Sequence, residues 1–389
     1  SGSGVQANAI TFTGGANALS FTAGGLTGGV ANLTGGIAVN GAGSLSVDQS
    51  GVDATIANGI SGDGSVVKSG TATVTLSGTN TYTGGTTIAA GTLAVSASAN
   101  LGDTAGGVTL AGGTPQANGT FTTARAVDVT AASTIDVAAA NNLTLTGSLT
   151  ATGGSTLSKA GTGTLILQGT GFGGNVVIDQ GTLSLSGAAL TAAANITTNG
   201  SVIDYANGEN NLSTITINSN TTQLQVLAGT AEQSGAIGET GGPRPLEKIG
   251  AGTLNLSAAN TYTGATTVTA GTLGLIGGGS IASSSEVNLA AAGAGFDISG
   301  TAAGATITTL GGVAGSTVAL GAQTLTISNG STAYAGDIGG TGGLTLAGGT
   351  LTLTGASTYT GATTITAGTL QIGNGGSVAG TSGFAVNAG

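Results

Sequence analysis

Carboxylates are the side chains of this sequence that could support acid–base chemistry. The chain of 389 residues has 15 Asp and Glu but no His and no Cys, which excludes a Ser-His-Asp triad, a Cys-His pair and an imidazole or thiolate metal site. Two carboxylates within about 5–10 Å could still cleave a glycosidic bond. The acids that lie close in sequence are Asp48 with Asp53, Asp128 with Asp136, and Glu232 with Glu239. No acids have the spacing of the short repeat described below together with an Arg or Lys, so we predict no catalytic residue and no enzyme.

Motifs for metal or nucleotide binding are present only as weak matches. Residues 292–297 (AGAGFD) make one imperfect copy of the calcium-binding nonapeptide, and one copy cannot bind as a roll because the ligands come from adjacent turns. A looser oxygen site at Asp63 or Asp103 stays open. Residues 277–282 (GGGSIA) fit the loose dinucleotide form, but no helix is predicted after them. We therefore predict no metal and no cofactor.

Charge limits the partners that the chain can have. Five Lys and Arg stand against 15 acids, for a net charge of −10 at pH 7, so the surface cannot neutralise phosphates and we predict no nucleic-acid partner. No apolar run approaches the roughly 20 residues of a membrane helix, so we predict no direct membrane insertion of this segment. The remaining partners are host or surface ligands and the chain itself, through end-to-end or lateral assembly.

Aromatic residues recur before glycine-rich corners and offer a candidate recognition surface. Exposed in a row, they could stack on sugars or other ligands; buried, they would be packing anchors for the corners. Their positions are Tyr82, Phe172, Tyr262 and Tyr359. A second candidate is Arg244, in the stretch 239–248, where Pro and charge cluster. Because Pro cannot serve in a central strand, this stretch is predicted to be a loop, and loops on repeat scaffolds often carry recognition.

These aromatics belong to a cassette of about thirty residues that occurs four times, at 68–95, 159–185, 248–275 and 344–372. The differences between successive aromatic positions are 172 − 82 = 90, 262 − 172 = 90 and 359 − 262 = 97. A long and nearly fixed period is typical of solenoids and arrays. We therefore predict one elongated repeat domain over residues 1–389 in place of several globular ones.

Each cassette contains a shorter repeat that predicts the fold. Gly-Thr-Leu recurs with its Thr at positions 253 and 272, and 272 − 253 = 19. Residues 253–256 (TLNL) alternate apolar and polar side chains, as a strand with one buried face does. Glycine-rich corners separate these strands. The pattern predicts an all-β, right-handed parallel β-helix (β-solenoid) with roughly 19 residues per rung, in which Leu254 lies directly over Leu273.

The cassette resembles the autotransporter-associated β-strand repeat of type V secreted proteins. The shared pattern is G-x-G-T-L-x-L-x-x-x-x-T-Y-T-G-x-T-T-x-x-A-G-T-L, which residues 250–275 and 348–372 match closely. The first copy departs at residues 72–74 (ATV), and the second has Phe172 for Tyr and Asn175 for Gly. The resemblance implies a β-helical passenger that is exported through the outer membrane of a Gram-negative bacterium. The family's signal peptide and C-terminal barrel are not found here, so we expect a mature or excised passenger segment.

These observations predict a non-enzymatic extracellular protein with a structural or adhesive role: a stalk, a coat or an adhesin at the cell surface. The alternative is a self-assembling subunit of an extracellular filament or sheath, in which open strand edges pair between copies. An enzyme that acts on polysaccharides is the third hypothesis, since many such enzymes are β-helices. Concentration-dependent fibres separate the first two hypotheses, and a glycan-hydrolysis screen addresses the third.

Overall fold

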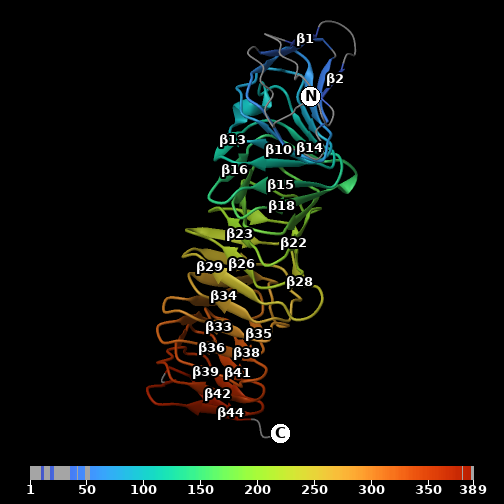
Figure 1. Ribbon diagram of the computed structural model, residues 1–389. Coiled ribbons are helices and arrows are strands. Elements are labelled where there is room, and N and C mark those ends of the chain that lie inside the picture. The colour runs from blue at the N-terminus through green and yellow to red at the C-terminus, as the bar shows by residue number, and fades with distance from the viewer. Residues whose placement is uncertain are drawn as a thin grey trace. The chain divides into compact units, whose positions relative to one another are not determined.

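The computed structural model describes residues 10–12, 18–21, 36–41, 43–48, 53–378 and 380–386. The remaining parts of the predicted 1–389 solenoid lie outside the described residues. The chain divides into two compact units, one of residues 1–184 with 188–194 and one of residues 185–187 with 195–389. Each unit is a parallel β-solenoid in which strands from successive turns lie side by side (Figure 1).

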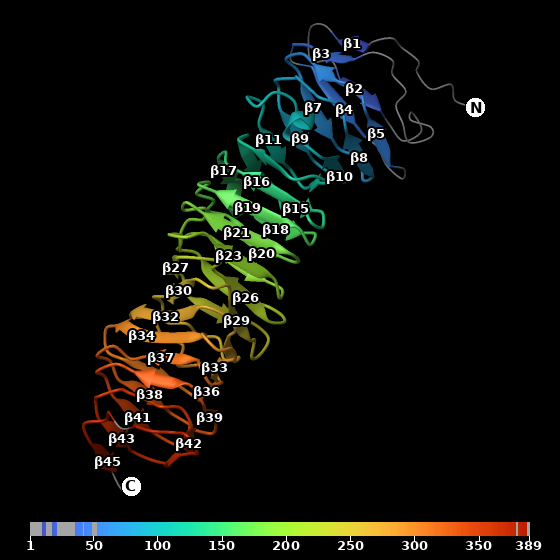
Figure 2. The same ribbon diagram turned by 90° about the vertical axis from the view of Figure 1, so that its left-hand side faces the viewer.

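In the first unit, strands that recur once per turn form long parallel sheets (Figure 2). One sheet contains β2 (Ala18–Phe21), β4 (Ser44–Val47), β7 (Ser65–Lys68), β9 (Thr86–Ile88), β11 (Val108–Leu110), β14 (Val127–Val129) and β17 (Leu149–Ala151). A second contains β5 (Ala54–Ile56), β8 (Thr73–Leu76), β10 (Thr92–Val95), β12 (Thr114–Ala117), β15 (Ser133–Val137), β18 (Thr156–Ala160) and β20 (Asn175–Ile178). The other strands here are β1 (Ile10–Phe12), β3 (Ile37–Val39), β6 (Ile60–Ser61), β13 (Phe121–Thr123), β16 (Asn142–Leu145) and β19 (Thr164–Gln168). Two short 3₁₀ helices, η1 (Ser98–Leu101) and η2 (Thr152–Gly154), lie between strands. Strand β21 (Thr182–Ser186) has its first three residues in this unit.

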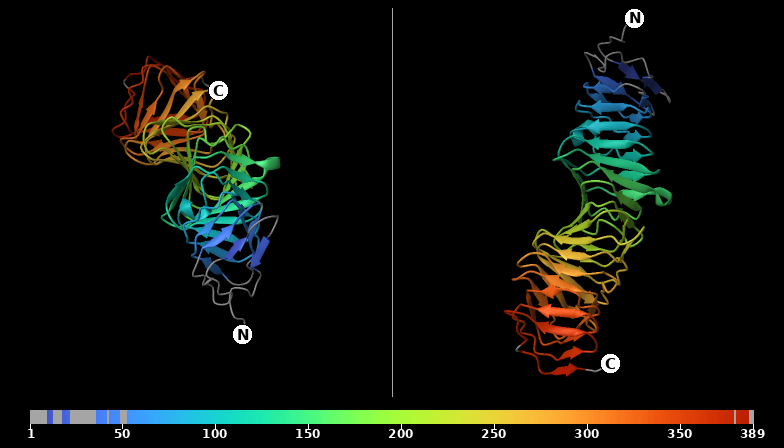
Figure 3. Two further views of the ribbon diagram at one scale, coloured as in Figure 1. Left: turned by 90° about the horizontal axis from the view of Figure 1, so that it is seen from above. Right: turned by 60° about the horizontal axis from the view of Figure 1, so that its bottom comes forward.

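The second unit repeats this arrangement (Figure 3). Its longest sheet contains β23 (Val202–Tyr205), β26 (Thr222–Gln225), β29 (Leu246–Ile249), β31 (Thr266–Val268), β33 (Val287–Leu289), β36 (Leu310–Gly312), β39 (Ala333–Tyr334), β42 (Thr350–Leu353) and β44 (Thr369–Ile372). Another contains β24 (Asn210–Asn211), β27 (Thr230–Gln233), β30 (Thr253–Leu256), β32 (Thr272–Gly277), β34 (Gly295–Thr301), β37 (Thr317–Ala319) and β40 (Asp337–Gly339). Strands β22 (Asn195–Thr198), β25 (Thr214–Ile217) and β28 (Ile237–Glu239) pair in parallel in that order. A five-stranded sheet contains β35 (Ala305–Ile307), β38 (Leu325–Ile327), β41 (Leu344–Leu346), β43 (Thr363–Ile365) and β45 (Phe384–Val386).

Register confirms the repeat that the sequence predicted. Strand β30 pairs in parallel with β32, and Leu254 lies directly opposite Leu273. Both leucines are fully buried, while Thr253 and Asn255 on the same strand are half-exposed. This alternation is the period-2 geometry of a strand with one face against a core. Each cassette therefore consists of two successive turns, one stacked on the other.

The length of a turn depends on the cassette. Inside three of the cassettes the register partners have the sequence separation that the Gly-Thr-Leu repeat predicted, namely Thr73 with Thr92, Thr253 with Thr272, and Thr350 with Thr369. Some turns outside the cassettes are longer, since Thr92 pairs with Thr114 and Thr222 with Leu246, whereas Val108 pairs with Val127 at the cassette separation. The predicted rung thus holds within the cassettes. In the longer turns the corners contain extra residues, because corner length does not alter the pairing of the strands on either side.

One glycine in each cassette is required by the stacking of the two turns. Gly271 begins the second Gly-Thr-Leu and has φ +65°, a conformation that glycine adopts at little cost. A Cβ atom there would lie 2.2 Å from the carbonyl oxygen of Gly252 in the turn below. Gly91, Gly181 and Gly368 have the same place in the other cassettes, with positive φ and a carbonyl oxygen similarly close. The recurrence of Gly-Thr-Leu in the sequence reflects this contact.

Candidate functional sites

The aromatic residues of the cassettes lie inside the solenoid. Tyr82, Tyr262 and Tyr359 are at most 1% exposed, and Phe172 is equally buried. The interpretation of these side chains as an exposed row that stacks on ligands is therefore wrong, and they are packing anchors of the corners. They occupy corner segments outside the strands, so the alternation of inward and outward side chains along a strand does not predict which way they point.

The hydroxyl of each cassette tyrosine contacts a threonine four residues further along the chain. The hydroxyls of Tyr262 and Thr266 are 2.8 Å apart, and those of Tyr359 and Thr363 are 2.6 Å apart. Burial raises the pKa of Tyr262 and Tyr359 above its usual value, despite the opposing effect of these hydrogen bonds. The tyrosines are thus neutral hydrogen-bonding groups of the core at physiological pH.

Three buried lysines are the functional groups that the sequence interpretation missed. Lys68, Lys159 and Lys248 begin three of the cassettes and are fully buried. The ammonium group of Lys248 donates to the carbonyl oxygens of Ile249 (2.9 Å), Gly250 (2.8 Å) and, one turn further along, Ala270 (3.2 Å). Lys159 makes the same three contacts with Ala160, Gly161 and Gln180, and Lys68 contacts Gly70 and Ala90. Each ammonium therefore joins two consecutive turns.

A signal for these lysines was present in the sequence. Lys248 stands two residues after the buried Leu246 on β29, so strand alternation directs it inward. In the fourth cassette the same place belongs to Leu346, because Lys248 pairs with Val268 as Leu346 pairs with Ile365. Burial lowers the pKa of Lys248 to about 8. The ammonium is not obligatory for the fold, since leucine replaces it once in this chain.

Arg125 is a fourth buried cation and lies outside the cassettes. It is 1% exposed, and its guanidinium donates to the backbone carbonyls of Ser98, Gly102, Asp103 and Gly106. These residues form η1 and the segment after it. Burial lowers the pKa of Arg125, while nearby Tyr82 and Asp103 oppose that shift. Arg125 thus supplies the donors for carbonyl groups that no strand pairs.

The surface charge is more one-sided than the net charge indicates. Four of the five Lys and Arg are buried, and Arg244 is the fifth. Its backbone N–H donates to Glu239 (2.6 Å), and its guanidinium contacts the carbonyl oxygens of Thr240 and Gly241 in its own loop. Burial alone would raise the pKa of Glu239, but hydrogen bonds from Thr263 and the backbone outweigh it and lower the pKa. Arg244 remains a predicted recognition residue.

The loop around Arg244 is shorter than the predicted 239–248. Glu239 ends β28 and Leu246 begins β29, so the loop consists of residues 240–245. Leu246, Glu247 and Lys248 pair with strands on both sides, β26 and β31. The two prolines fall inside the loop, where no strand partner needs their missing N–H groups. The charges of Glu247 and Lys248 led to the prediction that both residues lie in the loop, but they lie in β29 and Lys248 is buried.

The carboxylates of the proposed pairs contact hydroxyl, amide and backbone groups. Asp128 accepts from the Thr150 hydroxyl and Asp136 from the Gln116 amide, each at 2.8 Å. Glu232 accepts from Ser234 and Ser257, and Asp53 from the backbone N–H of Thr73. Asp103 and Asp297 each accept a nearby backbone N–H. Within the described part of the chain, no three carboxylates gather as metal ligands would.

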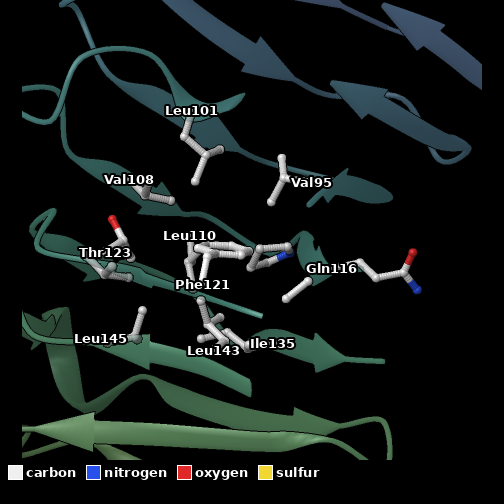
Figure 4. A pocket seen from close by; sticks show the side chains of 13 residues that line it. Val95, Leu101, Val108, Leu110, Gln116, Phe121, Thr123, Ile135, Leu143 and Leu145 are labelled. Atoms are coloured by element: carbon white, nitrogen blue, oxygen red, sulfur yellow. The ribbon is translucent and has the colours of Figure 1, made fainter. Parts of the chain in front are cut away.

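An apolar cavity of about 40 Å³ lies in the first unit (Figure 4). Pro115 and Ala117 stand opposite Leu93 and Val95 in the register of β12 with β10, where other turns place larger residues. A site for benzene has about 150 Å³, so this cavity is a packing defect. Its walls are Val95, Leu101, Val108, Leu110, Pro115, Gln116, Ala117, Phe121, Thr123, Val127, Ile135, Leu143 and Leu145.

Comparison with known proteins places the cassettes in a described family. The sequence model of the passenger-associated-transport-repeat matches residues 66–95, 157–185, 246–275 and 348–372, close to the four cassettes. A relative, the adhesin BmaC autotransporter of Brucella suis biovar 1 (strain 1330), is 37% identical over 175 residues. That alignment covers 42% of this chain and 5% of the relative.

No solved structure matches the chain. None of the described helices has the length and apolar character needed to cross a membrane. The four matched repeats coincide with the paired turns of a parallel β-solenoid, and the chain aligns with part of an autotransporter adhesin. The four cassettes are therefore passenger-associated-transport-repeats, and over part of its length the chain is similar to an autotransporter adhesin.

Proposed function

We propose that the chain is a non-enzymatic, adhesive segment of a passenger displayed at the surface of a Gram-negative bacterium. The observation that carries this proposal is the alignment with an adhesin autotransporter at 37% identity, together with the four transport repeats. Since the aligned region is 5% of that relative, the role concerns this segment and its repeats.

The composition of the solenoid supports adhesion through many weak contacts. Strands direct Leu, Val and Ile inward and present Thr, Ser and Asn on their outer faces, as the alternating burial of β30 and β42 illustrates. The lysines and the tyrosines are buried in the interior and do not contribute to the surface. The outer surface is thus uncharged or acidic over most of its length, and it offers hydroxyl and amide groups for hydrogen bonding.

Attachment of beads coated with the purified chain tests this proposal. We expect such beads to bind epithelial cells or matrix-coated glass in larger numbers than albumin-coated beads. Background attachment on every surface would overturn the adhesive role. A hydrolysis screen with polysaccharides belongs to the same experiment, because turnover that is lost on Asp→Asn or Glu→Gln substitution would replace adhesion by an enzymatic role.

Self-association is measured on the same preparation. Sedimentation velocity over a hundredfold range of concentration should give one species for an adhesive segment that acts alone. Fibres that grow with concentration would favour a filament subunit and would be visible by electron microscopy.

A further inference from the structure

A surface groove of about 350 Å³ lies in the second unit, at the start of the sheet that β35 begins. Its volume falls within the range of small-molecule sites. The corner after β32 forms one wall, and the corner after β34 with the strands β35 and β38 forms the other. The lining residues that carry a hydroxyl are Ser280, Thr306, Thr324 and Thr326.

The groove is rich in hydroxyl groups that the protein leaves available. Thr306 and Thr324 are exposed and Thr326 is half-exposed, and none of the three hydroxyls hydrogen-bonds a residue that the structure describes. Thr306 and Thr326 are register partners on adjacent strands, so they stand about 4.8 Å apart. Thr324 precedes Thr326 by two residues, which places it on the same face.

The edge of β35 adds backbone groups to these hydroxyls. Ala305 donates its N–H to Thr324, and Ile307 accepts from Ser328, so the residues on both sides of Thr306 use their backbone toward β38. In a parallel strand the residue between them directs its N–H and C=O to the opposite side. Strand β35 is the first of its sheet, so one donor and one acceptor of Thr306 face the groove.

No ionisable side chain lines the groove, since every lining residue is Gly, Ala, Ser or Thr. Elsewhere the exposed charge is acidic apart from Arg244, which disfavours sulfated or carboxylated ligands. The small residues provide no apolar pockets for the alternating side chains of a bound peptide strand. Dense hydroxyls without charge fit a ligand that is itself polyhydroxylated and neutral.

We propose that this groove binds a neutral glycan, with a sugar ring held by Thr306, Thr324, Thr326 and the free backbone edge of β35. The inference rests on the proposed adhesive function and names its ligand class. No tyrosine is available to stack on the sugar, because all five are buried. Binding therefore depends on hydrogen bonds alone. The affinity of a single site is low, but many copies of the chain on one surface bind with high avidity.

The proposal is tested by measuring the binding of beads that carry many copies of the full chain to an array of immobilised glycans. The array contains neutral oligosaccharides, sialylated oligosaccharides and heparin fragments. We expect signal on neutral glycans only, and at least a tenfold loss for the double variant Thr306→Val/Thr326→Val, which removes two hydroxyls and keeps the β-branched shape. The control Thr267→Val removes a hydroxyl from an outward position of β31 and should leave binding unchanged.

Each other outcome overturns the proposal in a distinct way. Neutral-glycan binding that survives the double variant places the site elsewhere, and a preference for anionic glycans refutes the ligand class. Capture of peptides that is insensitive to both Thr→Val changes would assign the β35 edge to strand addition. Bead attachment to cells without any array signal refutes the glycan site and leaves adhesion standing, whereas loss of attachment as well refutes the proposed function itself.

Discussion

The hydroxyl of Tyr82 lies 2.6 Å from the hydroxyl of Thr86, four residues further along the chain, and both side chains are buried. Two other cassettes repeat this pair. In the remaining cassette the corresponding residues are Phe172 and Val176, which are also buried and have no hydroxyl. The two positions therefore change together, because a buried hydroxyl that loses its partner costs more than the absence of both.

A double-mutant cycle in the first cassette measures this coupling. We expect Tyr82→Phe to lower the free energy of unfolding by about 1–2 kcal/mol, since the hydroxyl of Thr86 is left buried without its partner. Tyr82→Phe with Thr86→Val should cost less than the sum of the two single changes, by about 1 kcal/mol. Urea unfolding followed by circular dichroism gives the four values. Simple additivity would show that the hydroxyls do not interact.

The buried lysines give the stability of the fold a definite pH dependence. Burial lowers the pKa of Lys159 and Lys248 to about 8, from 10.5 in the unfolded chain. Between these pH values the unfolded chain binds more protons, so the free energy of unfolding rises with pH, by at most about 1.4 kcal/mol per pH unit for each lysine. Urea unfolding at pH 7, 8.5 and 9.5 should record this rise.

Tyrosine reverses the trend at higher pH. Burial raises the pKa of Tyr82 to about 12, above its unfolded value of 10.0, so stability is lost as pH rises beyond 10. We expect the most stable state between these two regimes. The variant Lys248→Leu, which copies Leu346, should reduce the rise between pH 8 and 10 and change stability at pH 7 by only about 1 kcal/mol. An unchanged slope in this variant would show that Lys248 does not titrate there.

The close approach of Gly271 to the turn below predicts a large effect of a single methyl group. Gly271→Ala places a Cβ 2.2 Å from the oxygen of Gly252 in addition to the cost of positive φ, and we expect a loss of at least about 2 kcal/mol. The control Gly293→Ala also has positive φ (+81°) but meets nothing within 4 Å, so it should cost only about 1 kcal/mol. Equal losses, measured by urea unfolding, would show that stacking does not require glycine at Gly271.

Arg125 is predicted to hold η1 and residues 102–106 in place. Arg125→Met leaves four backbone carbonyls without their donors, and we expect a loss of about 3 kcal/mol. Amide hydrogen exchange in residues 98–106 should accelerate more than exchange in β30 to β32, which belong to the other unit. A uniform change in both places would argue against a local role for Arg125.

Filling the cavity of the first unit should stabilise the chain. Ala117→Val adds two methyl groups at a buried position of β12, and removal of about 40 Å³ corresponds to roughly 1 kcal/mol. The matched change Ala231→Val, at a buried position of β27 that does not line this apolar cavity, should be neutral or destabilising because it overpacks the core. Denaturant midpoints of the two variants compare them directly.

The sequence by itself determined the repeat, the strands and their register. Period 2 in residues 253–256 and the regular return of Gly-Thr-Leu are local patterns, and backbone pairing converts them directly into stacked turns with Leu254 over Leu273. The same alternation would also have placed Lys248 inside, since it shares a strand face with Leu246. Because Lys248 is charged, it was instead predicted to lie in a loop.

Only the tertiary structure decided which way the corner residues point. Tyr82 and its counterparts lie between strands, where no alternation applies, and their burial depends on how the next corner closes over them. The partners of Arg125 include the carbonyl groups of Gly102 and Gly106 in a preceding turn, and no local pattern marks them. The hydroxyl groove at β35 likewise arises because one turn has a glycine corner where the next has a strand, a difference that appears only when the turns are stacked.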